Sequence, residues 1–192
     1  TNRGKYAIED YFDYSPEYED TLRKKGKNDI IDSLRSAANR ANIYFIRQKE
    51  ARGLGDAVLR AKSFIGSEPF YVLYGDDIIM SEKPVCLQLA EAYDKYNLAV
   101  AGVKEVSAEQ ILKYSSLDAK PIPGESNFYH VTDMIEKPKP EEVITRLSIL
   151  GRVLLTPDIF DILSSTKPGA GGEIQLTDAM RDLARSKGMT AV

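Results

Sequence analysis

Residues 69–77 read PFYVLYGDD, and this stretch decides the fold class. The run from Pro69 to Tyr74 is continuously apolar, which is typical of a strand that is buried on both faces of a sheet. A Gly-Asp-Asp sequence follows at once, and ligands in open parallel sheets bind at the carboxyl ends of the strands. We therefore predict a buried strand that presents Asp76 and Asp77 to a ligand, although Gly-Asp is equally common in solvated turns.

Helical and strand patterns alternate on both sides of this stretch. Strands that alternate with helices, over connections long enough for crossovers, predict an α/β fold with a mainly parallel sheet flanked by helices. The Pro-, Gly- and Ser-rich residues 120–127 predict a hairpin loop, so the strand after them is expected to be antiparallel. The predicted helices cover residues 28–41, 57–64, 84–96, 157–163 and 176–184, and the predicted strands cover residues 42–47, 69–74, 98–103, 128–135, 149–155 and 189–192.

Composition narrows the range of functions. A chain of 192 residues predicts a single domain, and a net charge of -3 argues against a polybasic nucleic-acid binder. Cys86 and His130 are the only residues of their types, which excludes an internal disulfide and any multi-cysteine or multi-histidine metal centre. We assign both to structural roles. A single cysteine fits a reducing cytoplasm, and no apolar run approaches the roughly 20 residues that span a bilayer.

Three further motifs could carry chemistry. Residues 53–58 (GLGDAV) match only the first part of a dinucleotide fingerprint, so a classical NAD site is not expected, and there is no Walker A sequence. Residues 136–140 (EKPKP) place a carboxylate and an ammonium on a backbone stiffened by proline, as would suit a ligand with hydroxyls and a phosphate. Residues 169–175 (GAGGEIQ) combine glycines that allow close approach with a carboxylate. Each motif alone also fits a charged or flexible surface loop.

In their order along the chain, however, the motifs resemble those of the bacterial UTP–glucose-1-phosphate uridylyltransferases, in the sugar-phosphate nucleotidylyltransferase superfamily. The resemblance implies a Rossmann-like nucleotide-diphospho-sugar transferase fold with a small antiparallel sugar-binding portion. It also implies Mg²⁺-dependent nucleotidyl transfer from UTP to glucose 1-phosphate, which gives UDP-glucose and pyrophosphate. The matching segments are TNRGK, RQKEARGLGDAV, PFYVLYGDD, EKPKPEE, GRVLLTPDIFD and PGAGGEIQLTDA.

The resemblance also implies a role for each matched residue. Asp76 corresponds to the magnesium ligand, and Lys137 to the lysine that contacts the sugar phosphate; these two are the expected catalytic residues. Two residues are expected at the nucleotide, Gln48 through its side chain on the uracil edge and Gly53 through its backbone. The expected sugar-binding residues are Asp77, Glu136, Gly151, Gly172 and Glu173.

The chain also departs from the family pattern. The glycine-rich G-x-G-T-R loop that cradles the triphosphate is absent, as is the Y-D-x-G segment with a second magnesium ligand. We therefore expect the single domain 1–192 to be the middle of the enzyme, incomplete at both ends and by itself inactive or nearly so. Asp56 stands where histidine is often found, and Ser115 stands where a Tyr-Gly pair usually supplies a sugar contact.

Two other functions stay open at this point. A related nucleotidylyltransferase could use dTTP or another sugar 1-phosphate, because such preferences depend on pocket details. A non-catalytic module that binds nucleotide sugars would need neither Asp76 nor Lys137. For either enzyme we expect a cytoplasmic protein without nucleic-acid or membrane partners, and the resemblance implies a homo-oligomer for the full-length enzyme.

Overall fold

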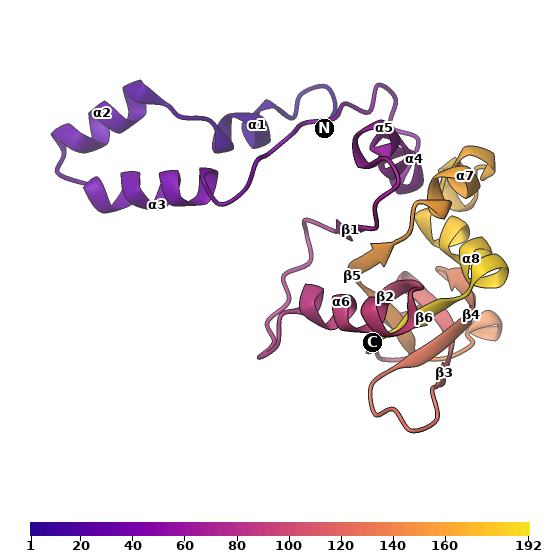
Figure 1. The fold of residues 1–192 in the computed structure, drawn as a ribbon. Coiled ribbons are helices and arrows are strands. Elements are labelled where there is room, and N and C mark those ends of the chain that lie inside the picture. The colour runs from indigo at the N-terminus through magenta and orange to yellow at the C-terminus, as the bar shows by residue number, and fades with distance from the viewer. The chain divides into compact units, whose positions relative to one another are not determined.

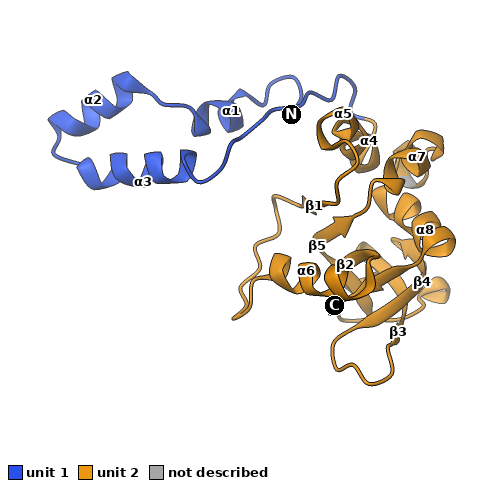
Figure 2. Ribbon diagram, viewed as in Figure 1, with its two compact units in different colours: residues 1–51 blue, residues 52–192 orange. Residues whose placement is uncertain are grey.

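The computed structural model describes residues 1–192, with Ala170 described only by its backbone (Figure 1). The chain divides into two compact units, Thr1–Ala51 and Arg52–Val192 (Figure 2). The single domain expected from the length stays a prediction. No helix in the described part of the chain combines the length and the apolar character that crossing a membrane requires.

The first unit is helical. Its helices are α1 (Tyr6–Phe12), α2 (Pro16–Lys24) and α3 (Asn28–Ala38), so the predicted helix over 28–41 is confirmed with an earlier end. Leu22 of α2 and Ile31 of α3 are both buried. Beside them, Arg35 donates two hydrogen bonds to the Glu19 carboxylate, at 2.9 and 2.6 Å, which ties α3 to α2.

The strand predicted over 42–47 is wrong, because this segment is irregular in the structure. Two hydrogen bonds at this segment stay within the unit: the terminal ammonium of Thr1 donates to the Ile46 carbonyl at 2.7 Å, and the Gln48 amide donates to the Thr1 carbonyl at 2.8 Å. Tyr44 is 64% exposed. A β-rich composition favours a strand only where a neighbouring strand and a buried face are available, and this segment has neither within the described residues.

Replacing Glu19 by glutamine is expected to make the α2–α3 pair less sensitive to acid. The hydrogen bonds from Arg35 are the main reason that the pKa of Glu19 lies below its ordinary value of 4.5. A lowered pKa means that the pair stabilises the fold above about pH 4.5 and that this contribution disappears as the pH falls through the folded-state pKa. The stability difference between wild type and Glu19→Gln should therefore shrink on acidification.

Hydrogen-exchange protection of the α2 and α3 amides, measured at about pH 6 and about pH 3.5, checks this expectation. Protection in the wild type should exceed that in the variant at the higher pH, and the two should converge at the lower pH. An equal difference at both pH values would show that the ion pair does not control the acid response.

The second unit is built on one sheet. Its strands stand in the order β1-β5-β2-β6-β4-β3. Over the described residues the hydrogen-bonded pairs are antiparallel except for β2 and β6, yet β1, β2, β6 and β3 all point the same way. The strands are β1 (Phe70–Leu73), β2 (Ala99–Glu105), β3 (Ser115–Pro121), β4 (Tyr129–Glu136), β5 (Leu147–Leu155) and β6 (Met189–Ala191).

Helices flank this sheet, which confirms the predicted α/β class. The sheet is mixed, because β5 lies between β1 and β2 and β4 lies between β6 and β3, each running against its neighbours. The predicted hairpin after residue 120 is confirmed as the antiparallel β3–β4 pair. The helices are α4 (Leu54–Arg60), α5 (Lys62–Ile65), α6 (Val85–Tyr96), α7 (Asp158–Ser165) and α8 (Leu176–Lys187), with short 3₁₀ turns at Ile111–Lys113, Pro140–Glu142 and Ala170–Gly172.

Strand alternation divides the core into two layers, one on each face of the sheet. Ala101 of β2 and Val153 of β5 belong to the larger cluster, together with apolar residues of α4, α7 and α8. Val100 and Leu154, their chain neighbours, belong to the smaller cluster with α6. Successive strand residues point to opposite faces, so the alternation places α6 on one face and α4, α7 and α8 on the other. Figure 1 shows these helices around the sheet.

The strand predicted over residues 69–74 is confirmed as β1, but the prediction that it is buried on both faces is wrong. The side chains of β1 alternate between half-buried and exposed, and Leu73 is 52% exposed. Within the described residues β1 pairs only with β5. Its buried side is well packed, because the Phe70 ring stacks on Phe160 of α7 with centroids 5.1 Å apart.

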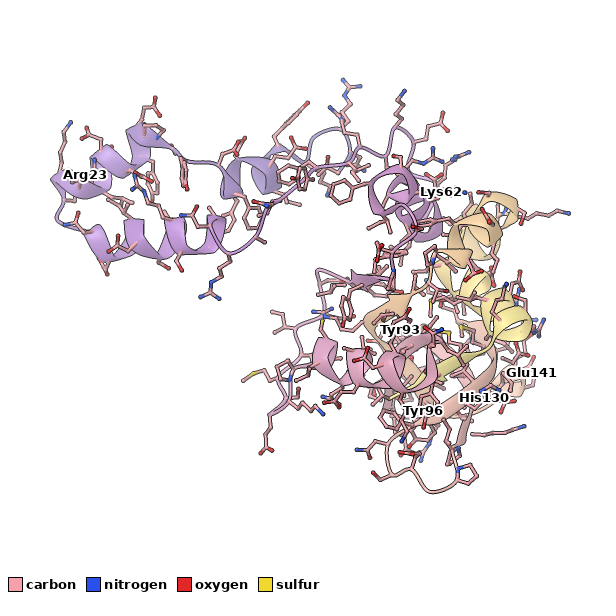
Figure 3. The ribbon with its side chains drawn as sticks, viewed as in Figure 1. Arg23, Lys62, Tyr93, Tyr96, His130 and Glu141 are labelled. Atoms are coloured by element: carbon pink, nitrogen blue, oxygen red, sulfur yellow. The ribbon has the colours of Figure 1, made fainter. Side chains whose placement is uncertain are left out.

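An ion pair and two single residues, one histidine and one cysteine, complete the description of this unit (Figure 3). Lys62 of α5 forms an ion pair with Asp161 of α7 at 2.9 Å, which joins two helices on the same face. His130, labelled on β4 in Figure 3, is exposed. Cys86 is a free, half-buried cysteine on α6.

Candidate active site

The turn after β1 is held firmly against β5. The Tyr74 amide donates to the Gly151 carbonyl at 2.9 Å, and the Arg152 guanidinium donates to the carbonyls of Tyr74 and Asp77 at 2.9 and 2.6 Å. The Asp77 amide closes the turn on the Tyr74 carbonyl at 3.3 Å. The two neighbouring carboxylates of Asp76 and Asp77 are exposed on this turn, so a rigid backbone presents them to solvent.

Gly151 is in close contact with Asp77. A Cβ atom at Gly151 would lie 2.0 Å from the Asp77 Oδ2 atom and 3.1 Å from its Cβ atom. The backbone of Gly151 also has a φ of +69°, a left-handed conformation that favours glycine. The structure therefore brings these two expected sugar-binding residues together.

Glu136 ends β4 and is hydrogen-bonded to the first turn of α8. The Thr177 hydroxyl donates to the Glu136 Oε2 atom at 2.8 Å. The next residue, Lys137, has a φ of +47° and donates its amide hydrogen to the Tyr114 carbonyl at 2.8 Å. The chain thus changes direction directly after Glu136, and the Lys137 side chain is exposed beside it.

The glycine motif at residues 53–58 is paired with the segment around Glu173. The Gly55 amide donates to the Ile174 carbonyl at 2.8 Å, and the Ile174 amide donates to the Arg52 carbonyl at 2.8 Å. Gly53 lies between these two bonds, and a Cβ atom there would lie 2.8 Å from the Glu173 Cβ atom and 2.8 Å from the Ile174 oxygen. Gly53 and Glu173 are therefore neighbours, as two of the matched motifs require if they serve one site.

The loop before Glu173 is tightly turned. The Gly169 amide donates to the Glu173 carbonyl at 2.8 Å, and the Gly172 amide donates to the Gly169 carbonyl at 3.0 Å. Gly172 has a φ of +75°, and a Cβ atom there would meet nothing within 4 Å. The glycine at this position suits the backbone conformation, and its surface stays open to a ligand.

A cavity joins several of these segments. Its volume is about 100 Å³, and it lies between the end of β4, the starts of β3 and β5 and the starts of α4 and α8. Ser115 and Glu136, which are partners across the β3–β4 ladder, both line it. The complete lining is Leu54, Tyr74, Tyr114, Ser115, Glu136, Ile149, Gln175, Leu176 and Thr177.

Tyr74 connects the cavity with the turn after β1. Burial raises the pKa of its phenol, and the negative charges of Glu136, Asp77 and Asp76 raise that pKa further. The phenol therefore stays protonated at physiological pH. Tyr74 thus lines the cavity together with Glu136, and its backbone is hydrogen-bonded within the turn that carries Asp76 and Asp77.

Other expected residues are placed less completely. Gln48 lies in the first unit, and its place relative to the cavity is outside what the structure describes. Asp56 is almost fully buried and is hydrogen-bonded to Arg52 at 2.8 Å and to Arg60 at 2.5 Å. Its carboxylate thus holds α4 to the preceding segment, which gives this departure from the family pattern a structural role.

Sequence reasoning missed the residues that support the site. Thr177, Tyr74 and Arg152 all lie inside segments that were matched as motifs, but nothing in their spacing shows what they contact. Thr177 touches Glu136 across 41 positions of sequence. Such a contact depends on how α8 packs against β4, which a single sequence does not reveal.

The donor atoms on the turn are compatible with Mg²⁺. Among the described residues, no group of three or more His, Cys, Asp or Glu side chains could hold a metal ion by itself. Mg²⁺, however, commonly takes one or two carboxylates and completes its shell with phosphate oxygens and water. The adjacent carboxylates of Asp76 and Asp77 match that donor set, provided that a substrate phosphate supplies further ligands.

Comparison with known proteins decides the family. The sequence model for nucleotidyl transferases matches residues 13–191. The chain belongs to the nucleotidyl transferase family. A UTP–glucose-1-phosphate uridylyltransferase of Bacillus subtilis is 46% identical over 97% of this chain, and one of Staphylococcus saprophyticus is 46% identical over the same share. The chain spans 62% and 64% of the length of these two relatives.

Solved structures agree with this family assignment. A UDP-glucose pyrophosphorylase in complex with UDP-glucose superimposes with a TM-score of 0.88 at 38% identity, covering all of this chain and 69% of that one. A UTP-bound enzyme of the same kind from Acinetobacter baumannii has a TM-score of 0.85 at 30% identity, covering 100% of this chain and 66% of the other. The mixed sheet and its flanking helices are thus the fold of these nucleotidyltransferases.

Proposed function

We propose that the natural protein containing this chain transfers a uridylyl group from UTP to glucose 1-phosphate, giving UDP-glucose and pyrophosphate. The observation that carries the proposal is the cavity lined by Glu136 and Tyr74, because the turn that follows Tyr74 carries Asp76 and Asp77 and is hydrogen-bonded to Gly151. The names of the similar enzymes supply the substrates, since both relatives are uridylyltransferases that use glucose 1-phosphate.

Each side chain has a role in this proposal. Glu136 and Asp77 accept hydrogen bonds from glucose hydroxyls, and the backbones of Gly151 and Gly172 allow the sugar to approach. Glu173 accepts further hydroxyl hydrogen bonds at the edge of the site. Gln48, whose amide can both donate and accept, reads the uracil edge, and Gly53 contacts the same base through its backbone.

The reaction joins two polyanions. A phosphate oxygen of glucose 1-phosphate attacks the α-phosphorus of UTP as the bond to pyrophosphate breaks, with no covalent enzyme intermediate. Lys137 places an ammonium at the sugar phosphate, where it reduces the repulsion between the two substrates. Asp76 would hold Mg²⁺, which when bound supplies positive charge to the phosphates. The rigid turn after β1 and the end of β4 orient both substrates, and this orientation provides most of the remaining rate enhancement.

The preferences for the nucleotide base and for the sugar can both be tested by measuring the pyrophosphate that the natural protein releases from its substrates. We expect turnover with UTP and glucose 1-phosphate, and at least about tenfold lower kcat/KM when dTTP replaces UTP. Equal or better use of dTTP, or of another sugar 1-phosphate, would assign the protein to a different branch of the family. A different result would favour a non-catalytic binding module: the protein shows no turnover, yet it binds UDP-glucose equally well with and without Mg²⁺.

Cellular location and assembly belong to the same proposal. A cytoplasmic location is supported by the single cysteine, and a homo-oligomer by the resemblance to the enzyme family.

A further inference from the structure

The contact between Thr177 and Glu136 links a helix to the end of a strand at the cavity. The Thr177 hydroxyl donates to Oε2 of Glu136 at 2.8 Å. The Glu136 side chain is half-buried, so a ligand in the cavity can reach its carboxylate. Both residues line the cavity.

Thr177 is itself firmly fixed. It is 6% exposed and lies in the first turn of α8, between Leu176 at 1% and Ala179 at 0% exposure. A β-branched side chain on a helix has few accessible χ1 rotamers, so burial and branching together leave the hydroxyl little freedom. Glutamate, in contrast, has a long side chain that loses substantial rotamer entropy when a ligand orders it.

We propose that Thr177 is a positioning residue, which holds the Glu136 carboxylate in the orientation that accepts a hydroxyl of the sugar phosphate. The inference rests on the proposed function, because it takes Glu136 as a sugar-binding residue. A carboxylate that is ordered before the substrate arrives costs less entropy on binding. Loss of the threonine hydroxyl therefore weakens binding of the sugar substrate and leaves the nucleotide unaffected.

The test compares variants of the natural protein in steady-state kinetics. Thr177→Val removes the hydroxyl and keeps the shape, and should raise the KM for glucose 1-phosphate about tenfold. The KM for UTP and the kcat should change less than about twofold. Thr177→Ser retains a donor and should restore the KM to within about threefold of the wild type.

A matched control removes a threonine hydroxyl elsewhere. Thr166 follows α7, where its hydroxyl donates to the Ile162 carbonyl at 2.9 Å, outside the cavity lining. Thr166→Val should leave both KM values unchanged. If Thr177→Val fails to fold, as judged by its melting temperature, Thr177→Ala removes the same hydroxyl without adding a methyl group to a packed site.

The outcomes separate this inference from the proposed function. Glu136→Gln should raise the KM for glucose 1-phosphate whether or not Thr177 positions the carboxylate. An unchanged KM would overturn the sugar-binding role of Glu136 itself. If Glu136→Gln raises this KM but Thr177→Val and Thr177→Ala do not, Thr177 does not position the carboxylate. Equal rises in the KM for glucose 1-phosphate and for UTP, or no rescue by serine, would indicate a merely structural role and also overturn the inference.

Discussion

Replacing Asp76 by asparagine is expected to lower the kcat of pyrophosphate release about a thousandfold. The amide keeps the size of the side chain but removes the negative charge, and a neutral amide is a poorer ligand for Mg²⁺ than a carboxylate. The turn should survive, because its hydrogen bonds run through the backbones of Tyr74, Asp77 and Gly151 and through the Arg152 side chain.

The control for this variant is an exposed carboxylate away from the turn. Asp94 lies on α6, on the face of the sheet that carries the smaller core cluster, and Asp94→Asn should retain full activity. Melting temperatures of both variants should match the wild type within about 3 °C. An Asp76→Asn enzyme with more than about a tenth of the wild-type kcat would remove Asp76 from its proposed role.

Replacing Gly53 by alanine is expected to destabilise the protein by about 3 kcal/mol. Gly53 has a φ of +103° and a ψ of 173°, a conformation that is essentially restricted to glycine. The added Cβ atom would also lie 2.8 Å from the backbone oxygen of Ile174, which the Gly55 hydrogen bond holds in place. Neither group can move aside without breaking the pairing between the two segments.

Gly124 offers a control that separates the cost of backbone strain from the cost of a steric clash between the added Cβ atom and its neighbours. Its φ is +82°, but a Cβ atom there would meet nothing within 4 Å. Gly124→Ala should therefore cost only the strain of the left-handed backbone, about 1 kcal/mol. Urea unfolding of both variants measures the difference, and equal destabilisation would show that the contact at Ile174 does not constrain residue 53.

The order of elements in the second unit could largely be predicted from the sequence. Apolar periodicity located α6, α7 and α8, and short apolar runs located β2, β5 and β6, because each of these elements buries a face against the sheet. The direction of β5 could not be predicted, since an apolar run looks the same in parallel and antiparallel pairs. The exposed side chains of β1 were missed because composition does not show which face of a strand is covered.

The candidate site could be predicted as a set of motifs but not as an arrangement. Matched segments pointed to Asp77, Gly151 and Glu136, and the structure adds that Asp77 contacts Gly151 and that Glu136 lines a cavity with Tyr74. The Thr177 contact depends on tertiary packing. At residues 42–47 the local sequence was misleading instead. Their strong β propensity did not produce a strand, because no partner strand was available.

The most direct measurement is a crystal structure of the natural protein with UDP-glucose and Mg²⁺. The account predicts a glucose hydroxyl within hydrogen-bond distance of Glu136, the Lys137 ammonium beside a phosphate, and the metal bound by Asp76. A nucleotide sugar bound elsewhere, with the cavity beside Glu136 empty and Asp76 away from the phosphates, would contradict it.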